Sequence, residues 1–282
     1  MSTAGSQSSR RTVVSVIAWR EAKATMRGIS GYAAITIALI VATWILLVDV
    51  RALEAGGHLV LADPFGPPLT IAMLVLALFL AVSAAVSAAR DRESGTLEVL
   101  FYGPVDEISY VLGKIGGLLL AYLAALPLLL ASLSLLALMT GFSLTLVIVA
   151  SLILSIVPAA EIVGFGVLLS IGTNRVRTAV LLLIGITVVL LGITVAYSMV
   201  LLIPIEDPSS PVLPLRDVLA ALDAGVRWIS PFAYLERVVD AAVTGAWRTA
   251  LISLAVAVAY TAVMICLAAY WMRRRGVHRR GE

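Results

Sequence analysis

The sequence contains few charged residues, and this scarcity restricts the class of protein more than any other feature. Asp, Glu, Lys and Arg make up 13% of the 282 residues, whereas a typical soluble domain has about 25%. Hydrophobic residues make up 61%, and the mean hydropathy is +1.06. A chain of this composition cannot present a charged surface to water, so we expect an integral membrane protein.

Cysteine and histidine are almost absent. The single cysteine, Cys266, lies in an apolar stretch, so no disulfide framework can form and nothing indicates an oxidising compartment. The histidines, His58 and His278, fall on opposite sides of the membrane in the topology predicted below, so they cannot form a metal site together. The N-terminal residues are polar and basic and lack the compact apolar run of a signal peptide, so we expect no removable leader.

Apolar residues gather into six long blocks. Each reaches the roughly 20 residues that a helix needs to cross about 30 Å of hydrocarbon, where only a helix satisfies its own backbone polar groups. The blocks cover about residues 31–50, 69–89, 115–139, 144–171, 178–203 and 249–271. The fourth is longer than a span requires, so we expect it to tilt or to kink at Pro158. The predicted fold is an all-α, polytopic membrane protein in which residues 1–282 form one transmembrane domain.

Basic residues are distributed unevenly between the two sides of the predicted spans. One side has 15 Lys and Arg residues and the other has five. The larger group comprises Arg10, Arg11, Arg20, Lys23, Arg27, Arg90, Arg92, Lys114, Arg175, Arg177, Arg273, Arg274, Arg275, Arg279 and Arg280. The positive-inside rule makes this side cytoplasmic, which places both termini in the cytosol and the chain in the cell membrane. Orientation therefore accounts for the net charge of +3 without nucleic-acid binding.

Three segments outside the spans are expected to be helical. Before the first span, apolar residues such as Val13 and Trp19 stand among basic ones, which is typical of a helix lying in the membrane interface. In the external connection between the fifth and sixth spans, apolar residues recur at helical spacing before and after Pro231. We expect two amphipathic helices there, packed on the outer mouth of the bundle.

Small residues recur at four-residue spacing on two spans. The second span has Ala81, Ala85 and Ala89, and the third begins with Gly113 and Gly117. Such ridges let helix backbones approach closely, either within one bundle or at a dimer interface.

The connection between the second and third spans is longer than a simple reversal of direction needs. It carries Gly95, then the run 96–100 of apolar, hydroxyl and acidic residues, and then Pro104. The pattern fits a short helix across the membrane plane, bounded by glycine and proline, with carboxylates toward the cytosol. An ordinary solvated loop fits it as well on physical grounds alone.

This connection resembles the signature of the type-2 permeases of ATP-binding-cassette (ABC) transporters. The resemblance rests on ARDRESGTLEVLFYGPVDEISYVLGKIGG, residues 89–117, and is carried by Glu93, Gly95, Thr96, Leu97, Glu98, Pro104, Gly113 and Lys114. Residues 230–245, SPFAYLERVVDAAVTG, are similar to a segment that often precedes the last helix of these permeases. Members often have a basic residue after the proline, whereas this chain has Asp106 and Glu107.

The resemblance implies a membrane-spanning transport subunit, with export more in keeping with the family than import. The connection would be a coupling helix that docks on a separate cytoplasmic ATPase, and two permease copies or paralogues would form a dimer in the lipid. The residues at the ATPase interface would be Arg92, Glu93, Gly95, Thr96, Leu97, Glu98, Pro104 and Lys114. ATP and Mg²⁺ would be bound by the partner, because Gly113-Lys114 is followed by Ile115 and is not a phosphate-binding loop. Lys114 itself is expected to extend to the membrane interface.

Glu161 is a carboxylate deep in the fourth span, roughly 15 Å from its cytoplasmic end at about 1.5 Å per residue. An ionisable group at this depth is a functional candidate and supports an alternative function, an ion- or proton-coupled secondary transporter. In a purely structural role Glu161 would be protonated and hydrogen-bonded, through Ser155 or a facing Thr or Tyr. No paired acids or serine–lysine arrangement in the spans indicates an intramembrane enzyme.

Overall fold

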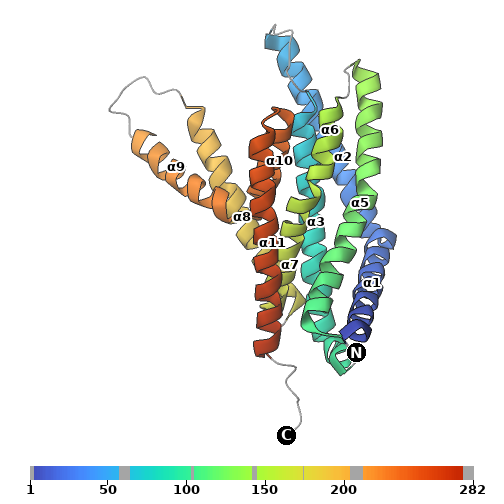
Figure 1. The fold of residues 1–282 in the computed structure, drawn as a ribbon. Coiled ribbons are helices and arrows are strands. Elements are labelled where there is room, and N and C mark those ends of the chain that lie inside the picture. Colours follow the sequence, from blue (N-terminus) through green and yellow to red (C-terminus); the bar gives the residue numbers. More distant parts are fainter. Residues whose placement is uncertain are drawn as a thin grey trace.

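The fold is a bundle of long helices (Figure 1). The computed structural model describes residues 3–56, 64–102, 105–141, 145–173, 175–203 and 212–275, which are helical apart from short connections. Six segments of this described part are long and apolar enough to cross a membrane. They are α2 (Ile29–Gly56), α3 (Gly66–Glu93), α5 (Glu107–Thr140), the pair α6 (Leu146–Leu154) and α7 (Ile156–Ile171), α8 (Val176–Leu201) and α11 (Trp247–Arg275). The prediction of an all-α protein with six spans is therefore confirmed.

The helix α3 lies at the centre of the bundle, in contact with α2, α5, α7 and α8. Its small residues allow α7 to approach closely: Ala81 and Ala85 are fully buried, and a Cβ on Gly166 would overlap the Ala81 carbonyl oxygen. One turn further on, the Ser170 hydroxyl donates a hydrogen bond of 2.7 Å to the Ala85 carbonyl. The small-residue ridge predicted on the second span is thus a contact between helices of one chain.

The fourth span is interrupted close to Pro158. The helix α6 ends at Leu154, and α7 begins at Ile156 after a turn at Ser155. A proline ring clashes with the carbonyl four residues earlier, which for Pro158 is that of Leu154. The hinge predicted at Pro158 is therefore present and falls one turn before it.

The N-terminal helix α1 (Thr3–Arg27) runs along the first half of α5. Arg10 forms an ion pair of 2.8 Å with Asp106 at one end of this contact. Further along, Gly117 faces Ala18 so closely that a Cβ on the glycine would lie 2.5 Å from the Ala18 carbonyl oxygen. Residue numbers rise together on both helices, so they are parallel. The segment predicted to lie in the membrane interface is helical. Its axis, however, runs parallel to that of α5, whereas a helix in the interface would lie across the spanning helices.

The two helices between α8 and α11 also differ from the prediction. In α10 (Pro231–Val243) the apolar face, including Leu235 and Val239, is fully buried against α11, α6, α7 and α3, whereas α9 (Val212–Ile229) contacts mainly α8. The Ile229 carbonyl, where α9 ends, accepts a hydrogen bond of 2.9 Å from Tyr260, which lies in the middle of α11. The connection between α9 and α10 therefore lies at the level of the middle of α11. The helix α10 is packed inside the bundle and not on its outer mouth as predicted.

Segments predicted to share the cytoplasmic side do lie at one end of the bundle. In Figure 1 the start of α1, the short helix α4 (Thr96–Tyr102) and the end of α11 are all at the lower end. Arg273 of α11 lies 3.5 Å from Glu107 at the start of α5. The relative placement agrees with the count of basic residues, and the assignment of this end to the cytosol stays a prediction.

The contact at Gly166 gives a stability test. We expect Gly166→Ala to destabilise the protein by about 1–3 kcal/mol, because the added methyl group meets backbone atoms of α3 that cannot move away independently. The matched control is Gly185→Ala in α8, where an added Cβ has no neighbour within 4 Å. Thermal unfolding of the detergent-purified variants measures both. An unchanged melting temperature for Gly166→Ala would contradict the close α3–α7 contact.

Candidate functional site

The helix α4 is the part of the candidate coupling segment that is open to a partner. It follows α3 after a sharp turn at Gly95, whose φ of +70° lies in the left-handed region that glycine adopts without strain. Leu97 is buried against the bundle, while Val99 and Tyr102 are 71% and 82% exposed. The structure has a short helix here over residues 96–102, and its role as a coupling helix stays a prediction. Pro104 and the side chain of Glu98 lie outside the described residues.

Hydrogen bonds fix the turn between α3 and α4. The Ser94 hydroxyl donates to the Arg90 carbonyl at 2.8 Å and lies 2.8 Å from the Thr96 hydroxyl. Thr96, predicted at the ATPase interface, therefore has a local role at the start of α4. A helix that begins on a hydrogen-bonded turn moves with the helix before it.

Two residues just before this turn hold the segment to α7 and α8. The Arg92 guanidinium donates to the carbonyls of Ile171, at 2.8 Å, and Thr173, at 3.3 Å, and so satisfies carbonyl groups at the end of α7. The Glu93 carboxylate accepts a hydrogen bond of 2.8 Å from the backbone N–H of Val176, the first residue of α8. A carboxylate is favoured at a helix N-terminus by the helix dipole. Arg92 and Glu93 thus join the coupling segment to the α7–α8 connection.

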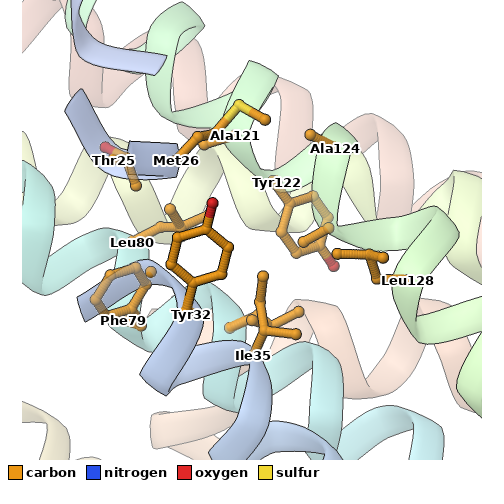
Figure 2. A pocket seen from close by; sticks show the side chains of 13 residues that line it. Thr25, Met26, Tyr32, Ile35, Phe79, Leu80, Ala121, Tyr122, Ala124 and Leu128 are labelled. Carbon is orange, nitrogen blue, oxygen red and sulfur yellow. The ribbon is translucent and has the colours of Figure 1, made fainter. Parts of the chain in front are cut away.

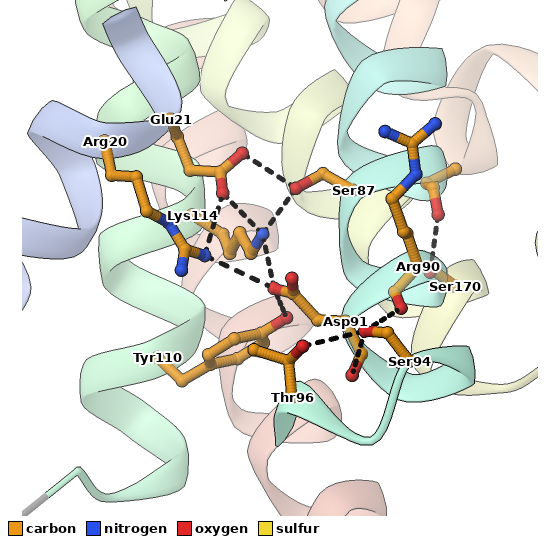
Figure 3. A network of polar contacts seen from close by, with 11 residues as sticks. Arg20, Glu21, Ser87, Arg90, Asp91, Ser94, Thr96, Tyr110, Lys114 and Ser170 are labelled. Atoms are coloured by element: carbon orange, nitrogen blue, oxygen red, sulfur yellow. Dashed lines mark hydrogen bonds and ion pairs between the residues drawn. The ribbon is translucent and has the colours of Figure 1, made fainter. Parts of the chain in front are cut away.

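An ion-pair cluster of four side chains, in which Lys114 is fully buried and Arg20 is half exposed, joins the same segment to α1 and α5 (Figure 3). The Lys114 ammonium lies 2.6 Å from the Glu21 carboxylate and 2.7 Å from that of Asp91. Arg20 lies 3.3 Å from Glu21 and 3.5 Å from Asp91. Two basic and two acidic side chains balance one another, so the cluster is neutral overall. We call Arg20, Glu21, Asp91 and Lys114 the ion-pair cluster.

Neutral hydroxyl groups complete the cluster. The Tyr110 hydroxyl donates to Asp91 at 2.9 Å, and the Ser87 hydroxyl donates to Glu21 at 2.7 Å. Lys114 in turn donates to the Ser87 hydroxyl. All three protons of the ammonium group therefore have acceptors, as a fully buried cation requires.

Lys114 therefore does not extend to the membrane interface as expected. Its side chain has no exposed surface, because α1 covers the face of α5 on which it stands. At Gly113 and Gly117, on either side of Lys114 in the sequence, α1 approaches α5 so closely that an added Cβ would overlap its atoms. In this structure Lys114 has no surface open to a partner, and its contact with the coupling segment is the ion pair with Asp91. The glycine pair is likewise a contact within the chain.

Asp106 and Glu107, where the resemblance expects a basic residue, are partly neutralised by the chain itself. Asp106 pairs with Arg10 at 2.8 Å and also accepts a hydrogen bond from Ser109, and Glu107 lies 3.5 Å from Arg273. These carboxylates connect α1 and α11 to the start of α5. They present less negative charge to a partner than the sequence alone indicates.

Glu161 is fully buried in α7, and among the described residues neither of its carboxylate oxygens has a hydrogen-bond partner. Ser155, the partner suggested by the sequence, lies 2.9 Å from the Tyr122 hydroxyl instead. The electrostatic neighbours of Glu161 are Tyr234 and Tyr260, but their hydroxyl groups donate to backbone carbonyls. The hydrogen-bonded structural role predicted for Glu161 therefore has no support in this structure.

The sequence pointed to Lys114 but missed its partners Glu21 and Asp91. One signal was available for Glu21: it is the sole acidic residue of the basic segment 1–27 and lies four residues after Ile17, on the helix face that meets α5. Asp91 gave no comparable signal, because it lies among charged residues that all suit a solvated loop.

These features define a class of protein: a helical, multi-pass membrane protein whose short exposed helix is bonded to the bundle on both sides. The family model described as ABC-2 family transporter protein matches residues 65–270 of the chain. The chain therefore belongs to the ABC-2 family of transporter membrane subunits, as the resemblance indicated. No curated protein matches the chain. The match begins at α3, so α1 and its contribution to the ion-pair cluster lie outside the matched region.

The ion-pair cluster predicts that removal of its buried lysine destabilises the protein, whereas removal of an exposed lysine of α1 does not. We expect Lys114→Met to lower the free energy of unfolding by about 3–5 kcal/mol, because Glu21 and Asp91 lose their buried cation and keep only the half-exposed Arg20. Thermal unfolding and protease sensitivity of α1 measure the loss of stability and the release of α1 from α5. The control is Lys23→Met on the exposed face of α1, which should change neither. Equal stability of both variants would show that the cluster does not hold α1.

Proposed function

We propose that the chain is the permease subunit of an ATP-driven exporter, in which α4 docks into a groove on a separate ATPase subunit. The observation that carries this proposal is the contrast within the coupling segment: Val99 and Tyr102 are exposed, while the residues before them are bonded to four other helices. Exposed apolar and aromatic side chains at a helix surface are typical of a protein interface. Membership of the ABC-2 family supports a partner ATPase in general.

The proposed transmission route has two branches. A displacement of α4 acts on Arg92 and Glu93, which are bonded to the end of α7 and the start of α8. It also acts on Asp91, whose ion pair with Lys114 leads to α5 and through Glu21 to α1. Rigid helices joined by hydrogen bonds and ion pairs transmit a displacement over the length of the bundle. Two permease copies or paralogues would change access to a path between them, while the ATPase binds ATP and Mg²⁺.

Substitution on the exposed face of α4 tests the docking. We expect Val99→Glu together with Tyr102→Ala to leave stability within about 0.5 kcal/mol of wild type, as is usual for exposed positions. Retention of the partner ATPase should fall at least tenfold, because the variant removes an apolar contact and adds a charge. Co-purification from membranes measures it, with Val99→Ile as the control that keeps the apolar surface. Normal retention by the double variant would mean that α4 does not dock.

The second candidate function is a proton-coupled transporter that uses Glu161. The observation in its favour is the buried carboxylate without a hydrogen-bond partner among the described residues. Isolated ionisable groups in spans are often part of proton pathways. Against it, Tyr234 and Tyr260, the titratable side chains that interact with Glu161, donate their hydroxyl protons to backbone carbonyls and not to Glu161.

The two functions predict different outcomes for Glu161→Leu. In the exporter, Leu removes an unpaired polar group, so we expect stability to rise by about 1 kcal/mol and ATP-driven activity to persist. Glu161→Gln keeps an unpaired polar group and should give no such rise. Proton flux into liposomes under an imposed pH gradient decides between the functions. A flux that depends on Glu161, together with loss of activity in both variants, would favour the proton-coupled transporter.

A further inference from the structure

An apolar groove of about 240 Å³ lies at the elbow where α1 meets α2. It is lined by Thr25 and Tyr32 from the two sides of the elbow, by Phe79 from α3, and by Tyr122 and Leu128 from α5. Figure 2 shows the Tyr32 ring and Leu128 facing the same space from different helices. We call this space the elbow groove. It is separate from the ion-pair cluster and has no part in the proposed coupling route.

The groove opens toward the surroundings of the bundle rather than into its interior. Tyr32, Leu128 and Met26 at its edge are 64%, 52% and 46% exposed, although they stand on or beside helices of the membrane-spanning class. Apolar surface on such helices faces hydrocarbon. An apolar cavity of about 150 Å³ is large enough to bind benzene, so the elbow groove accommodates several carbons of an acyl chain.

Two cationic residues of α1 flank the groove-lining residues Thr25 and Met26 in the sequence. Lys23 and Arg27 are exposed near the end of α1, and within the described part of the chain neither forms an ion pair. The one acidic side chain of α1, Glu21, is already held by Lys114. Since α2 begins at Ile29, these cations stand where the chain enters its first span. A basic segment directly before a spanning helix attracts anionic lipid headgroups.

We propose that the elbow groove binds one anionic phospholipid from the bilayer. An acyl chain fills the apolar space between α2, α3 and α5, and the phosphate group contacts Lys23 and Arg27. The close turn of the elbow favours this arrangement, because Gly31 lines the groove and a Cβ there would lie 2.5 Å from the Thr25 carbonyl oxygen. The binding needs no ATPase, so this inference goes beyond the proposed function and can fail independently of it.

Native mass spectrometry of the purified chain tests the proposal, with phosphatidylglycerol and phosphatidylcholine of identical acyl chains as probes. We expect one phosphatidylglycerol per chain, held roughly tenfold more tightly than phosphatidylcholine. Lys23→Gln with Arg27→Gln should remove the preference for the anionic lipid. The control for charge is Arg51→Gln, an exposed cation near the other end of α2. Equal retention of both lipids by the wild-type chain, or an undiminished preference in the double variant, overturns the proposal.

A second variant tests the acyl-chain site. Ala124→Phe fills the groove and should weaken retention of both lipids, whereas Leu123→Phe, on the same helix but outside the groove, should not. Equal effects of the two variants would overturn the site. If Ala124→Phe fails to fold, the charge variants decide alone, because both cations are exposed. A disulfide-linked dimer through Leu128→Cys in a Cys266→Ser chain, with no lipid retained, would instead assign the groove to a second copy.

Discussion

The arrangement of the coupling segment depends on one electrostatic constraint: a buried cation must be paired. Lys114 has no exposed surface, and the Glu21 and Asp91 carboxylates lie within 3 Å of its ammonium group and offset the cost of burying it. Because Glu21 comes from α1 and Asp91 from the end of α3, pairing the lysine also places α1 against α5 and sets the position from which α4 departs. Separating any one of these helices would leave a charge in an apolar environment.

The other contacts of the segment extend this constraint across the bundle. Arg92 and Glu93 follow Asp91 directly and bond to the ends of α7 and α8, so three consecutive side chains of α3 reach different helices. The exposed surface of α4 begins only a few residues later. A partner that pushes on Val99 and Tyr102 therefore acts on a segment bonded to much of the bundle. This geometry suits the proposed role of a subunit that receives movement from a partner.

Much of the fold followed from hydrophobic length and from backbone rules. The six spans were predicted because apolar blocks of this length have one solution in a bilayer, and the break in the fourth span followed from the missing N–H and the ring of Pro158. The pairing of Lys114 could not be predicted, because it joins residues 93 positions apart and a charged residue near a span end also suits exposure. The depth of α10 was missed for a related reason: an amphipathic pattern shows that one face is buried but not against what.

The most direct test of the account is photo-crosslinking from α4 in membranes that contain the proposed partner ATPase. With p-benzoyl-phenylalanine at position 102, where the native tyrosine is 82% exposed, the account predicts a covalent product with the ATPase. The same group at position 202, which is 83% exposed and follows the far end of α8, should give none. A product at position 202, or no product at position 102 in a complex that co-purifies, would contradict the claim that α4 is the docking element.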